Sequence, residues 1–133
     1  RCRVLVADDC EANRKLFGLI LRRAGYEVAF AENGQEAVDA CKRSAGGCGY
    51  HLVLMDMQMP EVDGLEATRR LRAMGYRRPI VALTADATIE TRNKAEESGC
   101  DDFLAKPLRS QSLLDTVARL LGHRRHEVAS TAA

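Results

Sequence analysis

Short apolar runs recur along the chain and alternate with stretches in which apolar residues return every three or four positions. Runs of this length, bounded by polar turn residues, are typical of β-strands, and the pattern between them is typical of helices. We predict five strands, over residues 4–7, 26–31, 51–55, 80–83 and 101–105. Because strands that alternate with helices form βαβ units, the sheet should be parallel.

The polarity of each run predicts its place in the sheet. The first, third and fourth runs are apolar throughout, as strands covered on both faces must be. The second contains Glu27 between Tyr26 and Val28, and the fifth carries Asp101 and Asp102, so these two should lie at the edges. The predicted fold class is therefore α/β: a doubly wound five-stranded parallel sheet in the order 2-1-3-4-5, flavodoxin-like, with helices on both faces.

Local signals mark the ends of the predicted helices. Two pairs have the spacing of a capping box, namely Asn33 with Glu36 and Asp63 with Glu66. Glycines that can end a helix follow three segments, at Gly25, Gly75 and Gly99. The segment from about residue 88 to residue 98 has little apolar surface to bury, so we expect it to be weakly held.

Length and charge fit one small domain. The 133 residues are 46% hydrophobic, enough for a continuous core, and we assign residues 1–121 to the domain and 122–133 to a disordered tail. A formal net charge of +1 argues against binding to nucleic acid or an acidic membrane. No apolar run approaches the roughly 18 residues of a membrane span, and five scattered cysteines fit a reducing compartment. We therefore expect a cytoplasmic protein without direct membrane contact, which begins at Arg1 like an excised fragment.

Polar residues follow the predicted strands at the edge where open parallel sheets bind ligands, beyond the carboxyl ends. Asp8 and Asp9 follow the first strand and Asp56 the third, while Thr84 follows the fourth and Lys106 the fifth. Clustered carboxylates repel one another unless they are protonated or bound to a cation, and oxygen donors suit Mg²⁺. The sequence therefore predicts a magnesium site at this edge.

Beside a magnesium ion, a carboxylate can attack a phosphoryl group as a covalent nucleophile. Asp56 is the best candidate because it ends a central strand, whereas the adjacent Asp8 and Asp9 are suited to gripping the metal. Lys106 would pair with Asp56 and then with the phosphoryl group, and Thr84 would donate to a phosphoryl oxygen. Any one of these acids alone could be a solvated turn residue, but together with the lysine and the hydroxyl they favour a phosphoacceptor site.

Four motifs, in order and each at a predicted strand end, resemble those of the response regulator receiver family of two-component signalling. They are Val6-Ala7-Asp8-Asp9, Met55-Asp56-Met57-Gln58-Met59-Pro60 followed by Asp63-Gly64, Leu83-Thr84-Ala85, and Phe103-Leu104-Ala105-Lys106-Pro107. The resemblance covers roughly residues 3–121, and Asn13-Arg14 with the Met-Gln-Met-Pro run is most similar to receivers of hybrid histidine kinases. It implies a cis Lys106–Pro107 bond and transfer of a phosphoryl group to Asp56 from a histidine kinase or a histidine phosphotransfer domain.

The resemblance also implies how the metal is held. Mg²⁺ or Mn²⁺ would bind to Asp9, Asp56 and the backbone carbonyl of Gln58, with Asp8 acting mostly through water. The domain would catalyse its own phosphorylation and dephosphorylation without being a multiple-turnover enzyme. As the cytoplasmic part of a phosphorelay, it could belong to a membrane-bound kinase.

Two further pairs of residues have expected roles after phosphorylation. In the family, a threonine and an aromatic residue move together, which corresponds here to a switch formed by Thr84 and Phe103. Glutamine side chains can orient an attacking water, so we also expect Gln58 and Asp86, each two residues beyond a site residue, to set the lifetime of the phosphorylated state.

Three other functions compete with this interpretation. A magnesium phosphatase with an aspartyl nucleophile commonly has a second aspartate two residues later, where this chain has Gln58. A flavin-binding module needs a neutral loop after the first strand, and Asp8 and Asp9 would repel its phosphate. A receiver-like adaptor that is never phosphorylated would not need the intact nucleophile, hydroxyl and lysine.

Overall fold

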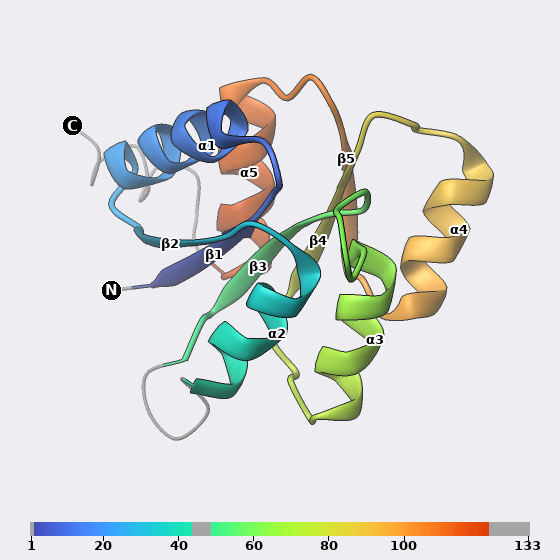
Figure 1. The fold of residues 1–133 in the computed structure, drawn as a ribbon. Coiled ribbons are helices and arrows are strands. Elements are labelled where there is room, and N and C mark those ends of the chain that lie inside the picture. Colours follow the sequence, from blue (N-terminus) through green and yellow to red (C-terminus); the bar gives the residue numbers. More distant parts are fainter. Residues whose placement is uncertain (1, 44–48, 123–133) are drawn as a thin grey trace.

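The computed structural model describes residues 2–43 and 49–122, and it confirms the predicted doubly wound sheet. Five parallel strands lie in the order β2-β1-β3-β4-β5, with helices on both faces (Figure 1). The strands are β1 (Arg3–Ala7), β2 (Glu27–Ala31), β3 (Leu52–Asp56), β4 (Ile80–Thr84) and β5 (Asp102–Ala105). The helices are α1 (Glu11–Arg23), α2 (Gly34–Arg43), α3 (Gly64–Ala73), α4 (Ile89–Ser98) and α5 (Ser110–Leu120). Every strand end lies within one residue of its predicted position, and the predicted tail lies outside the described residues apart from Gly122.

The central strands are buried on both faces, as their apolar sequences predict. Alternate side chains of β1, β3 and β4 face α2, α3 and α4, and the others face α1 and α5, so the sheet separates two hydrophobic clusters. Every residue of β3 and β4 is buried, whereas β2 and β5 keep exposed or half-buried positions, as expected of edge strands. Among the described residues, no helix is long and apolar enough to cross a membrane.

The register of the parallel strands aligns their carboxyl ends. Ala7 of β1 pairs with Met55 of β3, and Asp56 pairs with Leu83 of β4. Asp8, which follows Ala7, and Asp56 therefore reach the same edge of the sheet. This alignment brings residues distant in the chain together at one site.

The predicted helix signals are present. Asn33 and Asp63 each accept a hydrogen bond from the backbone N–H three residues later, at Glu36 (2.8 Å) and Glu66 (2.9 Å). Gly99 ends α4 in the left-handed region, with φ of 115°. Of the ten residues of α4, all of them described, only Ala95 and Ser98 are buried, in line with the weak apolar face of this segment.

Candidate metal and phosphoacceptor site

Three aspartates meet at the carboxyl edge of the sheet. Asp8 and Asp9 follow β1 and Asp56 ends β3, and carboxylate oxygens from all three lie within 4.8 Å of one another. Asp8 is fully buried and Asp56 is 4% exposed, whereas Asp9 is exposed. The cluster is therefore open to solvent on the side of Asp9.

Lys106 reaches this cluster from the loop after β5. Its Nζ lies 3.0 Å from Oδ2 of Asp8 and 3.1 Å from Oδ2 of Asp56. The Lys106–Pro107 bond is cis, as the family resemblance implies. One ammonium against three carboxylates leaves an excess of negative charge, which a divalent cation could balance.

Burial shifts the charge states of the central pair. It raises the pKa of Asp56, and Asp8 adds to the rise, although the Gln58 N–H and Lys106 oppose it. Burial alone would lower the pKa of Lys106, but the hydrogen bonds and charges of Asp8 and Asp56 outweigh it and raise this pKa. Lys106 is therefore protonated beside Asp56, whose ionised form is disfavoured unless a further positive charge neutralises it.

The donor set of this site fits magnesium. Only oxygen atoms are offered by Asp8, Asp9 and Asp56, and hard divalent cations prefer carboxylate and carbonyl oxygens. The exposed Asp9 leaves room for the several waters that Mg²⁺ retains. Of the three predicted ligands, Asp9 and Gln58 are exposed and Asp56 is buried.

Asp8 is held by more partners than the other two acids. Its Oδ1 accepts from the backbone N–H of Cys10 (2.9 Å), and its Oδ2 accepts from the Asn13 amide (3.4 Å) as well as from Lys106. An Arg14 Nη donates to its backbone carbonyl at 2.7 Å. The sequence singled out Asn13-Arg14 as a motif but not these contacts, because nothing in a sequence marks which carbonyl an arginine will reach.

Thr84 is buried at the end of β4, and its hydroxyl is engaged by the following loop. The hydroxyl donates to the carbonyl of Asp86 (3.2 Å) and accepts from the N–H of the same residue (3.0 Å). The Asp86 carboxylate accepts from Thr88 N–H and from the Thr91 hydroxyl. The side chain of Asp86 therefore faces the first turn of α4, and hydrogen bonds link Thr84 to that helix.

Gln58 contributes its backbone to the site. Its N–H donates to Oδ1 of Asp56 at 3.2 Å, and the residue itself is exposed. The loop between β3 and α3 thus orients the proposed nucleophile through the main chain.

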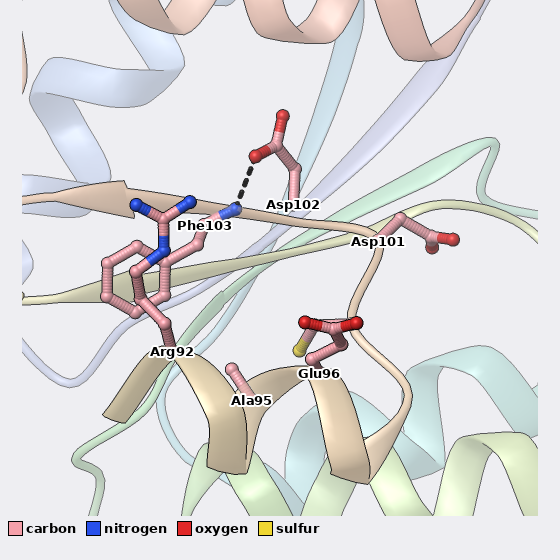
Figure 2. A pocket seen from close by; sticks show the side chains of 7 residues that line it. Arg92, Ala95, Glu96, Asp101, Asp102 and Phe103 are labelled. Atoms are coloured by element: carbon pink, nitrogen blue, oxygen red, sulfur yellow. Dashed lines mark hydrogen bonds between the residues drawn. The ribbon is translucent and has the colours of Figure 1, made fainter. Parts of the chain in front are cut away.

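Phe103 lies on β5, on the side that faces α4. The guanidinium of Arg92 lies 5.4 Å from the centre of the Phe103 ring, and Figure 2 shows the two side chains together at one end of a groove of about 410 Å³. The groove is otherwise lined by Ala95 and Glu96 of α4, by Cys100 and Asp101 of the loop before β5, and by Asp102 of β5 itself. The ring predicted to switch is therefore half-buried, with an arginine of α4 stacked on it.

Comparison with known proteins agrees with this geometry. The sequence model of a protein family, the response regulator receiver domain, matches residues 4–118 of this chain. The sensory/regulatory protein RpfC of Xanthomonas campestris is 39% identical over 122 residues, which cover 89% of this chain and 16% of RpfC. The chain therefore spans less than a fifth of the length of this relative.

Two solved structures are also similar. The receiver domain of the sensor histidine kinase PA1611 from Pseudomonas aeruginosa, with magnesium coordinated in its active-site cleft, has a TM-score of 0.82 and 35% identity, covering 91% of this chain and 98% of that one. The receiver domain of Ssk1 from Saccharomyces cerevisiae, solved with the phosphotransfer protein Ypd1, has a TM-score of 0.82 and 32% identity, covering 90% and 88%. The chain belongs to the response regulator receiver family of two-component signalling, whose members here include receivers of histidine kinases.

Proposed function

We propose that this domain accepts a phosphoryl group on Asp56 from a phosphohistidine of a histidine kinase or a histidine phosphotransfer protein. The observation that carries the proposal is the placement of Asp56 Oδ2 3.1 Å from Lys106 Nζ, within a cluster of three carboxylates. Support for the partner comes from the Ssk1 receiver, which was crystallised with Ypd1, and support for the metal from the PA1611 receiver.

In the transfer step, an oxygen of Asp56 forms a bond to phosphorus while the phosphorus–nitrogen bond of the phosphohistidine breaks, and the imidazole nitrogen keeps the electron pair. Lys106, already between Asp8 and Asp56, would then pair with a phosphoryl oxygen. Thr84 would turn its hydroxyl from Asp86 towards another phosphoryl oxygen. These residues neutralise charge that develops on the transferred group.

Asp9, Asp56 and the backbone carbonyl of Gln58 would hold Mg²⁺ or Mn²⁺, which when bound supplies neutralisation of the phosphoryl oxygens. Asp8 would act through water, because its own oxygens already accept hydrogen bonds from Cys10, Asn13 and Lys106.

Movement of Thr84 would release the loop that its hydroxyl now holds. Since Asp86 in that loop binds the first turn of α4, and Arg92 of α4 stacks on Phe103, a shift of Thr84 can be transmitted to the ring through the helix. We infer that Thr84 and Phe103 form the switch and that the surface around α4 reports phosphorylation.

We further infer that Gln58 and Asp86 set the lifetime of phospho-Asp56. Replacing Gln58 or Asp86 by alanine should change the hydrolysis rate of the isolated phosphodomain, because each flanks a residue of the phosphoryl site. Unchanged decay of the phosphorylated form in both variants would show that neither residue acts on the attacking water.

The function is tested by incubating the domain with Mg²⁺ and a small acyl phosphate and then measuring its mass. We expect one added phosphoryl group, lost in EDTA and in Asp56→Asn. Steady release of phosphate from many phosphomonoesters would instead indicate a phosphatase, and failure of the wild-type domain to gain mass would indicate an adaptor that is never phosphorylated. We also propose a cytoplasmic location, in keeping with a phosphohistidine donor.

A further inference from the structure

Arg14 contacts the metal site without belonging to it. Its side chain is only 14% exposed, although it lies on the first turns of the surface helix α1. One Nη donates to the Asp8 carbonyl at 2.7 Å, and the other lies 3.8 Å from Oε1 of Glu32, which follows β2. The guanidinium therefore joins the loop after β1 to the loop after β2.

The Asp8 carbonyl is a sensitive point for this contact. A peptide unit is planar, so the direction of this carbonyl also fixes the direction of the Asp9 N–H and the position of the Asp9 Cα, from which the side chain departs. The N–H of Asp8 is already held by the Ala31 carbonyl (3.0 Å) and its carboxylate by Cys10, Asn13 and Lys106. Arg14 holds the remaining polar atom of this residue, and with it the peptide plane that leads into Asp9.

Asp9 depends on its backbone for orientation. It is exposed, and within residues 2–43 and 49–122 its carboxylate makes no hydrogen bond or ion pair. The loop from Asp8 to Cys10 is only three residues long, between the end of β1 and the start of α1. The backbone of this short loop therefore places the Asp9 carboxylate, and Arg14 holds the peptide plane with which the loop begins.

We propose that Arg14 is a positioning residue for the divalent metal ion, acting through the Asp8 carbonyl to aim the Asp9 carboxylate at it. This inference rests on the proposed function, since it assumes that Asp9 and Asp56 bind the metal. Removing a group that orients a metal ligand commonly weakens metal binding by about 10- to 100-fold.

Simple electrostatics predicts the opposite sign. A guanidinium close to a cluster of carboxylates repels a divalent cation, so removing its charge alone would strengthen Mg²⁺ binding. A weaker affinity in Arg14→Gln can therefore arise only from lost geometry. Arg14→Lys retains the charge but not the fork that spans the Asp8 carbonyl and Glu32, so it too should bind Mg²⁺ more weakly.

Two controls on the same helix separate these effects. Lys15→Gln removes a neighbouring charge whose partner, 3.1 Å away, is Glu11 rather than Asp8. Arg22→Gln removes another arginine that donates to a strand carbonyl, that of Val28 at 3.4 Å, far from the acids along α1. Neither control should weaken Mg²⁺ binding.

The experiment is a calorimetric Mg²⁺ titration of the unphosphorylated domain, with urea unfolding in EDTA as a second readout. We expect the Mg²⁺ dissociation constant to rise by about 10-fold in Arg14→Gln and several-fold in Arg14→Lys, with both controls near wild type. The urea transitions in EDTA check that Arg14→Gln and Arg14→Lys are folded at the temperature of the titration.

Unchanged or tighter Mg²⁺ binding in Arg14→Gln would overturn the positioning role while leaving the proposed function intact. If Arg14→Gln does not fold, Arg14→Lys decides: wild-type affinity in that variant also overturns the role. A wild-type domain that does not bind Mg²⁺ would overturn the proposed function itself, so the two failures are distinguishable.

Discussion

At the scale of single residues, Asp56 occupies a place that suits chemistry better than stability. It is 4% exposed, next to the fully buried Asp8, and among the described residues only Lys106 and a backbone N–H offset its charge. Burial and a neighbouring carboxylate both disfavour ionisation. Without a bound metal ion, the ionised carboxylate of Asp56 therefore lowers the stability of the folded domain.

Asp56→Asn should accordingly raise the free energy of unfolding near neutral pH in EDTA, by about 1 kcal/mol. The pKa of Asp56 is raised in the folded state, so its ionised carboxylate lowers the free energy of unfolding at pH values above that pKa. This loss of stability disappears as the pH falls towards the pKa of Asp in the unfolded chain, about 4. The gain should thus shrink on acidification, as measured by urea unfolding at several pH values. Glu97→Gln, at an exposed site on α4, should show no such gain, and an Asp56→Asn variant less stable than wild type at neutral pH would contradict this explanation.

At the scale of elements, the start of α3 must lie close to the end of β3. A Cβ added at Gly64 would lie 2.2 Å from the Asp56 carbonyl oxygen, far inside van der Waals contact. The helix therefore begins against the backbone of Asp56, the proposed phosphoacceptor, and only glycine allows this approach.

Gly64→Ala should destabilise the domain by about 2–3 kcal/mol and weaken Mg²⁺ binding, because the loop that carries Gln58 must move. Gly75→Ala is the matched control: nothing lies within 4 Å of its added Cβ, but its φ of 93° should still cost about 1 kcal/mol. Urea unfolding and a Mg²⁺ titration measure both effects. Equal stability of the two variants would show that the close approach at Gly64 is not needed.

Helices α2 and α4 have ten residues each but differ in burial. Five residues of α2 are buried against two of α4, so opening of α4 exposes less apolar surface. Hydrogen exchange of the unphosphorylated domain should therefore be faster in α4 than in α2. Equal protection of the two helices would argue against α4 as the mobile part of the switch.

At the scale of the whole molecule, the sequence was enough to predict the fold and the acid cluster. The apolar runs of β1, β3 and β4 could only be central strands, and parallel strands align their carboxyl ends, so Asp8 and Asp56 had to converge. The contacts of Arg14 and Arg92 could not be predicted, since a long side chain that reaches a carbonyl or a ring leaves no periodic pattern. The roles of Gln58 and Asp86 stay predictions.

The central claim is that Asp9, which follows β1, and Asp56, which ends β3, bind the same divalent ion. Substoichiometric Mn²⁺ tests it directly, because this paramagnetic ion broadens the amide resonances nearest to it. We predict that broadening begins at the amides of Asp9, Asp56 and Gln58 and is lost in Asp9→Asn. Broadening centred elsewhere, or equal in the wild-type and Asp9→Asn domains, would contradict the account.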